Sequence, residues 1–209
     1  MKKLKSDAMR KTGIPGTVML TFDDGPDIRY TGRLLDLLKE QNVQAVFFVV
    51  TREAKGNEAL IKRMQAEGHR VGFHSIDHQN AMLRGWQHTR TDFRDGVQFF
   101  RELGIMPVYY RPPWGLSNLF TGYYMKQYNL KMVLWDVMAE DWKAGATVDL
   151  IREKCLSRVK DQSIICLHDG GERSGGAKGA PEKVLQALPG VIRELKMAGY
   201  RFVLPGENK

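Results

Sequence analysis

The stretch Thr17–Pro26, which reads TVMLTFDDGP, decides the fold. Its first six residues are β-branched, aliphatic or aromatic, and they predict a buried strand over Thr17–Phe22. Asp23 and Asp24 follow at once, and Gly25-Pro26 then indicates a turn. Two adjacent carboxylates repel each other unless a cation or an arginine lies near. The pair therefore favours a metal site over a simple turn.

The rest of the chain alternates between short apolar runs and helical periodicities. The predicted strands are Thr17–Phe22, Ala45–Val50, Arg70–Phe73, Val108–Tyr110, Lys131–Val137, Ser163–Leu167 and Arg201–Leu204. The predicted helices are Tyr30–Gln41, Glu58–Glu67, Trp86–Leu103, Asn118–Tyr128, Thr147–Val159 and Lys183–Ala198. Consecutive βα units predict an α/β fold with about seven largely parallel strands. This leaves a shortened (β/α) barrel or an open doubly wound sheet.

The composition is that of one folded domain rather than a disordered, disulfide-rich or membrane protein. The chain has 209 residues, of which 43% are hydrophobic and 27% charged, and only two cysteines. The longest charge-free run in the first half, Asn42–Thr51, is about half of the ~20 residues that a bilayer span needs. We therefore expect no transmembrane segment.

The net charge of +8 suits anionic partners, but the positive residues are scattered over the chain. The one dense cluster comprises Lys2, Lys3, Lys5, Arg10 and Lys11. We interpret the charge as an ordinary basic surface and expect no nucleic acid partner. The first sixteen residues contain no apolar h-region, so nothing there directs export. On this basis the protein is cytoplasmic, unless a leader or anchor has been removed.

Polar residues that carry chemistry accompany the ends of five predicted strands. They are Asp23-Asp24 with the first strand, His74 and His78 with the third, Arg111-Pro112-Pro113 with the fourth, Asp136 and Asp141 with the fifth, and His168-Asp169 with the sixth. The carboxyl ends of parallel strands meet at one edge, where α/β folds build their active sites. We therefore expect these side chains to gather in one site.

The histidine pair and the arginine each allow two interpretations. His74 and His78 are four residues apart, a spacing that suits two ligands of one divalent ion, although the pair also fits surface or capping histidines. A nearby carboxylate would complete a two-histidine, one-carboxylate site with open positions for water and substrate. Arg111 precedes two prolines that lock the backbone, which indicates either a rigidly held cation or a stiff turn with a solvated arginine.

Together these motifs resemble the polysaccharide deacetylase family, carbohydrate esterase family 4. Five stretches match in the family's order: Thr21–Pro26, His74–His78, Arg111–Gly115, Asp136–Trp142 and Ile165–Asp169. The match runs from about Thr17 to Leu204, and it selects the shortened, distorted (β/α) barrel over the open sheet. By this resemblance, residues 17–205 would be a polysaccharide deacetylase catalytic domain. Residues 1–16 would be a disordered or extended N-terminal segment.

The resemblance also implies roles for individual residues. Asp24, His74 and His78 would bind a divalent metal, with Zn²⁺ expected and Co²⁺, Ni²⁺ or Mn²⁺ as alternatives. Asp23 would be the general base for the attacking water, and Arg111 would hold it in place and keep it ionised.

The same resemblance assigns the acid and the substrate pocket. His168 would be the general acid, oriented by Asp141. The residues implied to line the pocket for the acetyl group are Pro113, Trp114, Trp142 and Cys166.

Four positions depart from the family's common pattern and leave the substrate open. They are Arg70, Phe73, Ile76 and Cys166, the last standing where an aliphatic pocket residue is usual. The implied partner is an acetylated glycan, either an N-acetylglucosamine polymer such as peptidoglycan or chitin, or O-acetyl xylan. The alternatives are another amidase on the same fold, a non-haem iron oxygenase, and a non-catalytic glycan-binding domain. Most such glycans lie outside the cytoplasm, which implies an extracytoplasmic enzyme whose leader has been removed.

Overall fold

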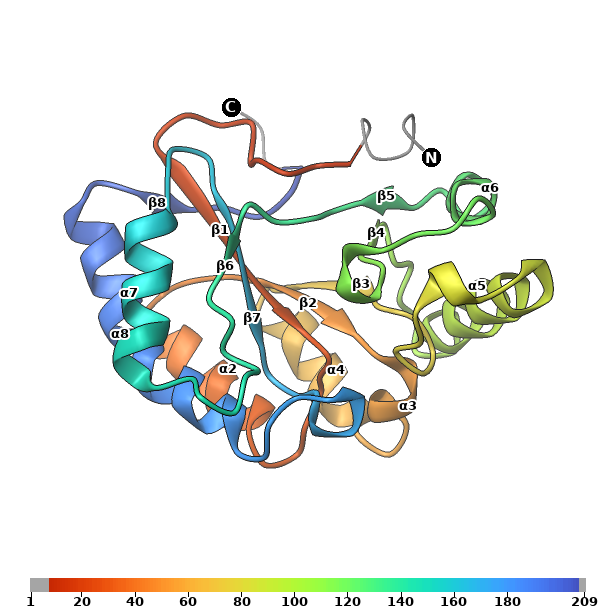
Figure 1. Ribbon diagram of the computed structural model, residues 1–209, viewed down its shortest axis with the longest axis horizontal. Coiled ribbons are helices and arrows are strands. Elements are labelled where there is room, and N and C mark those ends of the chain that lie inside the picture. Colours follow the sequence, from red (N-terminus) through yellow and green to blue (C-terminus); the bar gives the residue numbers. More distant parts are fainter. Residues whose placement is uncertain (1–7, 207–209) are drawn as a thin grey trace.

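The computed structural model describes residues 8–206, which form one parallel sheet with helices on its outer face (Figure 1). The strands are β1 (Thr17–Asp23), β2 (Val46–Val49), β3 (Arg70–Phe73), β4 (Tyr109–Tyr110), β5 (Lys131–Met132), β6 (Val137–Met138), β7 (Ile164–His168) and β8 (Arg201–Phe202). Their order is β5-β4-β3-β2-β1-β7-β6, and β8 pairs with the start of β1. The Asp-Asp strand predicted from the sequence thus lies inside the sheet, between β2 and β7.

The sheet is curled into an incomplete barrel. β5 and β6 lie at opposite edges of the strand order, yet only residues 133–136 separate them in the chain. Because an extended residue spans at most ~3.6 Å, the two edges come within roughly 20 Å of each other. The predicted distorted, shortened (β/α) barrel is therefore confirmed. The single predicted strand Lys131–Val137 is wrong, because the chain crosses from one edge to the other within it.

The N-terminal segment lies along this gap. Met9 pairs with Val133 in parallel orientation, and Lys11 pairs with Ser163 in antiparallel orientation. Residues 1–7, which include Lys2, Lys3 and Lys5 of the predicted basic cluster, fall outside the described residues.

The helices agree with the sequence periodicities to within three residues at each end. They are α2 (Thr31–Glu40), α4 (Glu58–Ala66), α5 (Trp86–Glu102), α6 (Thr121–Gln127), α7 (Val148–Arg158) and α8 (Ala180–Met197). Within the described residues, the short α-helix α3 (Thr51–Ala54) and the 3-10 helices η1 (Ala81–Leu83), η2 (Pro113–Gly115) and η3 (Glu172–Ser174) are too short to show a periodicity and were not predicted. Within residues 8–206, no helix combines the length and the apolar character needed to cross a bilayer.

Alternation along the strands separates an outer core from the barrel interior. Leu20 and Phe22 of β1 belong to the large cluster beneath the helices, whereas Met19 belongs to a smaller cluster inside the curl. Since successive side chains of a strand point to opposite faces, Thr21 and Asp23 share the inner face with Met19. The inner face of β1 thus changes from apolar at Met19 to polar at Thr21 and charged at Asp23.

The contact between α5 and the sheet leaves no room for a side chain at Gly96. A Cβ atom there would lie 2.4 Å from the Phe73 ring, whereas at Gly32 in α2 the nearest atom would be 3.8 Å away. We expect Gly96→Ala to lower the free energy of unfolding by about 1–2 kcal/mol, because overpacking outweighs the gain in helix propensity. Gly32→Ala should leave it unchanged or slightly raised. Urea unfolding measures both, and equal effects of the two variants would contradict this packing.

Candidate active site

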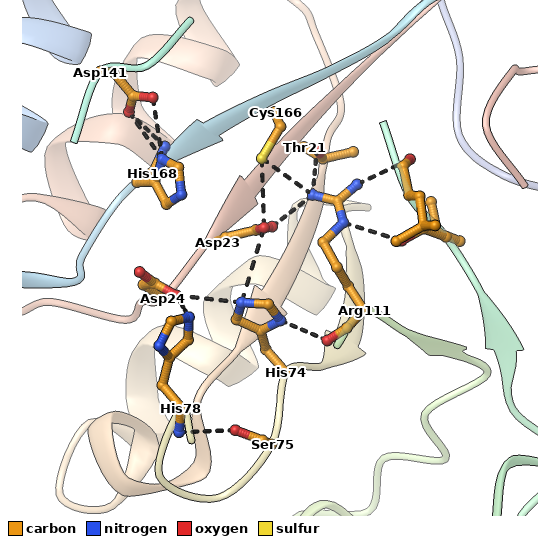
Figure 2. A network of polar contacts seen from close by, with 12 residues as sticks. Thr21, Asp23, Asp24, His74, Ser75, His78, Arg111, Asp141, Cys166 and His168 are labelled. Carbon is orange, nitrogen blue, oxygen red and sulfur yellow. Dashed lines mark hydrogen bonds and ion pairs between the residues drawn. The ribbon is translucent and has the colours of Figure 1, made fainter. Parts of the chain in front are cut away.

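The pairing of β1 with β7 brings four functional side chains together. Asp23 of β1 pairs with His168 of β7, and Thr21 pairs with Cys166. Because residues two apart share one face of a strand, all four side chains point into the barrel interior. Figure 2 shows them at the carboxyl ends of the two strands, beside the loop that carries His74 and His78. The gathering of these residues at one sheet edge is the arrangement that the sequence predicts.

Asp24, His74 and His78 converge on one point. Asp24 Oδ1 lies 3.3 Å from His74 Nε2 and 3.1 Å from His78 Nε2 (Figure 2). All three side chains are buried, and one potential ligand atom from each lies within 4.8 Å of the others. Among the described residues, Asp24 Oδ1 accepts no hydrogen bond of normal geometry. Two imidazole nitrogens and one otherwise unsatisfied carboxylate oxygen fit a divalent metal ion.

The electrostatics of this group are those of a cation site. Burial alone would raise the pKa of Asp24, but the contacts from His74 and His78, together with the charge of His168, hold it well below its usual value. Burial likewise opposes protonation of His74, but the charges of Asp23 and Asp24 outweigh it and raise the pKa of this histidine. The pocket therefore attracts positive charge.

Backbone and side-chain hydrogen bonds orient the two histidines. His74 Nδ1 lies 2.6 Å from the backbone oxygen of Arg111, which leaves Nε2 facing Asp24. The backbone N–H of His78 donates to Ser75 Oγ at 2.8 Å. Asp24, Ser75 and His78 all have positive φ angles, of 73°, 80° and 51°. Such backbone strain is concentrated where function fixes the geometry.

Asp92 supports the same loop and was not predicted from the sequence. Its Oδ1 accepts the backbone N–H of Ile76 at 2.6 Å, between the two histidines. Burial raises the pKa of Asp92 to about 7, although this hydrogen bond opposes the increase. A sequence signal was available, because Asp92 lies on the buried face of α5 beside Phe93 and Gly96. A carboxyl on an apolar helix face needs a partner.

Arg111 holds Asp23 from the interior side. The Arg111 side chain has 0% exposure, and its Nη1 donates to Asp23 Oδ1 at 2.6 Å and to Thr21 Oγ1 at 2.8 Å (Figure 2). Its other nitrogens donate to the backbone oxygens of Val133 and Leu134. A buried guanidinium with this many acceptors fixes the carboxylate and balances its charge. Of the two interpretations of Arg111, the structure confirms the rigidly held cation and contradicts the solvated arginine.

His168 forms a pair with Asp141. The Nδ1 atom of the ring lies 3.1 Å from Asp141 Oδ1, and the backbone N–H of His168 donates to Asp141 Oδ2 at 2.8 Å. Burial would lower the pKa of His168, but the charge and hydrogen bond of Asp141, reinforced by Asp24 and Asp23, raise it to about 10. The imidazole is therefore protonated at neutral pH, and Nε2 is the ring nitrogen left for a substrate.

A cleft of about 470 Å³ opens over these groups. Its lining comprises Asp23, Asp24, His74, His78, Trp114, Trp135, Met138, Trp142, His168 and Ser174–Gly176. Trp114 is 50% exposed and Trp142 36% exposed, so two of the predicted pocket residues form walls open to solvent. The other two, Pro113 and Cys166, are buried and do not line this cleft. Met138 and Ser174 were not singled out in the sequence.

The structure contradicts the expected place of Asp136. Its Oδ1 accepts the backbone N–H of Ile164 at 2.7 Å, and its Oδ2 accepts the Ser163 hydroxyl at 2.9 Å and pairs with Lys11 at 2.6 Å. Asp136 thus lies at the amino end of β7, whereas the cleft lies at the carboxyl end. The error arises because the predicted fifth strand is divided, and Asp136 belongs to the crossing segment.

Comparisons with known proteins agree with this geometry. The family model described as polysaccharide deacetylase matches residues 10–133. A peptidoglycan-N-acetylglucosamine deacetylase of Bacillus cereus is 34% identical over 193 residues, which cover 91% of this chain and 86% of that protein. A chitooligosaccharide deacetylase of Azorhizobium caulinodans is 28% identical over 200 residues, covering 92% and 94%.

A solved structure extends the similarity to three dimensions. It is the crystal structure of a peptidoglycan N-acetylglucosamine deacetylase in complex with 4-naphthalen-1-yl-N-oxidanyl-benzamide. The TM-score is 0.85 at 31% sequence identity, and the match covers 94% of this chain and 89% of that one. On the matching family model, the similar relatives and the shared fold, this chain belongs to the polysaccharide deacetylase family.

Proposed function

We propose that this chain is a metal-dependent deacetylase that hydrolyses the N-acetyl amide of N-acetylglucosamine residues in a glycan such as peptidoglycan or chitin oligomers. One observation carries the proposal. A carboxylate, Asp23, and a protonated imidazole, His168, face the same cleft from paired positions of β1 and β7, beside a group of three metal-ligand side chains. The related proteins act on these glycans by their names. Peptidoglycan lies outside the cytoplasmic membrane, and an enzyme acting on it would work there.

Asp24, His74 and His78 would hold the metal ion. We propose Zn²⁺, because two imidazoles and one carboxylate are a ligand set that catalytic zinc ions use. A divalent ion bound there would polarise the acetyl carbonyl and make a water molecule more acidic. The open side of the group faces the cleft.

Asp23 would accept the proton of the attacking water. Arg111 Nη1 donates a hydrogen bond to Asp23 Oδ1, so Asp23 Oδ2 is left to accept the proton. This Oδ2 atom lies 3.9 Å from His74 Nε2, beside the proposed metal ligands. The buried guanidinium holds this carboxylate by a short ion pair in a site that is otherwise sheltered from water. Asp23 thereby acts as the general base.

His168 would supply the proton that the departing amine needs. An amide nitrogen leaves poorly unless it is protonated, and His168 carries a proton at neutral pH because of Asp141. Asp141 also fixes the ring, so that Nε2 is left for the substrate. The two roles follow from the two partners. Asp23, paired with the Arg111 guanidinium, can accept a proton, whereas His168, paired with the Asp141 carboxylate, can donate one.

The walls of the cleft suit a sugar. Trp114 and Trp142 are partly exposed, and Trp135 completes an aromatic lining. Aromatic rings pack against the apolar faces of sugar rings and against a methyl group, while leaving polar edges in water. The Trp114 backbone has φ 53°, and its ring centroid lies 4.3 Å from that of His78. This wall therefore stands directly beside the proposed metal ligands.

The proposed activity has a direct test. We expect metal-loaded protein to release acetate from N-acetylglucosamine oligomers or peptidoglycan fragments, with a mass decrease of about 42 Da per acetyl group replaced by hydrogen. A chelator should abolish the release, and added Zn²⁺ or Co²⁺ should restore it. Mass loss from acetylated xylan alone would instead make the enzyme an esterase. Glycan retention on a column without acetate release under any metal would make the domain a binding module.

Replacement of the acid tests its role. We expect His168→Ala to lower kcat on the amide substrate about 10²- to 10⁴-fold, because the leaving amine is no longer protonated. The metal content at one equivalent should not change, since His168 is outside the Asp24 group. His88→Ala is the matched control, because His88 is half-buried at the start of α5 and does not line the cleft. Steady-state kinetics that show equal losses in both variants would refute the assignment.

The dependence of activity on pH tests the role of Asp141. The group that must stay protonated is His168, so kcat/KM falls as the pH rises through its pKa. Asp141→Asn removes the charge that raises this pKa, and we expect the alkaline limb of the pH–rate profile to move about 1–3 units lower. Asp149→Asn, an exposed change in α7, should leave the limb in place. An unmoved limb in Asp141→Asn would show that another group sets it.

A further inference from the structure

A second set of metal-ligand atoms lies next to the first. Asp23, Cys166 and His168 each offer one such atom, and these atoms lie within 4.8 Å of one another. The strand register explains this, because Cys166 and His168 are two residues apart on β7 and His168 pairs with Asp23. The cluster is distinct from the Asp24 group and shares no residue with it.

Cys166 is the member of this second cluster that has no role in the proposed reaction. It is 0% exposed, and its Sγ atom lies 3.5 Å from Asp23 Oδ2 and 3.7 Å from Arg111 Nη1 (Figure 2). The sulfur thus touches the carboxylate oxygen that Arg111 leaves free. A thiolate, a carboxylate and an imidazole form a donor set that suits Zn²⁺ and similar thiophilic ions.

His168 is oriented as a metal ligand would be. Its Nδ1 atom is engaged by the Asp141 carboxylate at 3.1 Å, which leaves Nε2 as the coordinating nitrogen. Metal-binding histidines are usually held in this way by a carboxylate on the other ring nitrogen. Asp23 and His168 both line the cleft, so an ion can reach them from solvent.

Arg111 opposes a second cation, but the charges of the cluster outweigh it. The guanidinium is already paired with Asp23 Oδ1 and bonded to Thr21. Asp23 and a Cys166 thiolate together carry two negative charges against one, and the Asp141 carboxylate adds another through His168. Binding requires that the S–H bond of Cys166 and the Nε2–H bond of the protonated His168 both break as the metal–sulfur and metal–nitrogen bonds form, with the two protons passing to the buffer. This makes the second site weaker than the first.

We propose that Asp23, Cys166 and His168 form a second metal site, which takes a thiophilic divalent ion such as Zn²⁺ or Co²⁺ once the Asp24–His74–His78 site is full. Asp23 Oδ2 lies 3.9 Å from His74 Nε2, so the two ions would be neighbours, as in many two-metal sites. An ion at this site occupies the base and the acid at once. Excess zinc therefore inhibits deacetylation, a consequence that rests on the proposed function.

Cobalt titration of the metal-free full chain tests the site without any activity measurement. The first equivalent of Co²⁺ should give no sulfur-to-cobalt charge-transfer band, since the Asp24 group contains no sulfur. Further Co²⁺ should produce such a band in the near ultraviolet. Cys166→Ala should lose the band, whereas Cys155→Ala should keep it, because this other buried cysteine lies in α7 outside the cluster. Cys166→Val replaces Cys166→Ala if the alanine variant does not fold.

The outcomes separate the site from the enzyme. Absence of the band at excess Co²⁺, its appearance at the first equivalent, or its survival in the Cys166 variant would each overturn the proposal. A Cys166-dependent band together with lower acetate release at excess metal supports both the site and the assigned roles of Asp23 and His168. The same band with undiminished release supports the site and contradicts those catalytic roles.

Discussion

The structure depends on the placement of two adjacent carboxylates in a buried position. Asp23 ends β1 and Asp24 follows it directly, with exposures of only 3% and 7%. Two like charges so close together and so far from water are strongly unfavourable unless each meets a cation. Arg111 meets Asp23, and the two histidines meet Asp24 at distances that suit a shared metal ion. The rest of the site is arranged around these two pairings, Asp23 with Arg111 and Asp24 with the two histidines.

The fold allows each of the two carboxylates to meet its own partner because the parallel sheet is curled on itself. The cationic and ligating groups come from the ends of several strands: His74 and His78 follow β3, Arg111 follows β4 and His168 ends β7. The inner face of the curl carries Asp23 and His168 at this edge, while an apolar cluster that includes Met19 and Ile164 lies toward the opposite end. The charges therefore sit on a packed, rigid base rather than in a mobile loop.

Much of the site could be predicted from the sequence because it depends on which residues directly follow each strand. A polar residue directly after a buried strand has to lie at the carboxyl edge of a parallel sheet, and this rule placed Asp23, Asp24, His74, Arg111 and His168 correctly. Asp136 was misplaced because the rule requires the correct end of the strand, and the single predicted fifth strand is in fact two short strands, β5 and β6. Asp92 was missed because its partner, the backbone N–H of Ile76, lies in a loop 16 residues away. The place of Asp92 on an apolar helix face signals that it needs a partner, but the identity of that partner depends on three-dimensional packing.

The tryptophan walls and the buried Cys166 show the same limit. Trp114 and Trp142 could be connected to a pocket only through the family resemblance, and that resemblance did not reveal that the thiol faces Asp23 rather than the cleft. The direction of a side chain inside a curled sheet follows from register and twist together, which short sequence motifs do not contain.

The central claim, that Asp24, His74 and His78 hold one divalent ion beside Asp23, is tested most directly by anomalous X-ray diffraction from crystals of protein loaded with one equivalent of Zn²⁺. The account requires a single strong zinc peak within about 2.0–2.2 Å of Asp24 Oδ1 and the Nε2 atoms of both histidines. A peak elsewhere in the molecule, or no peak from zinc-loaded protein, would contradict it.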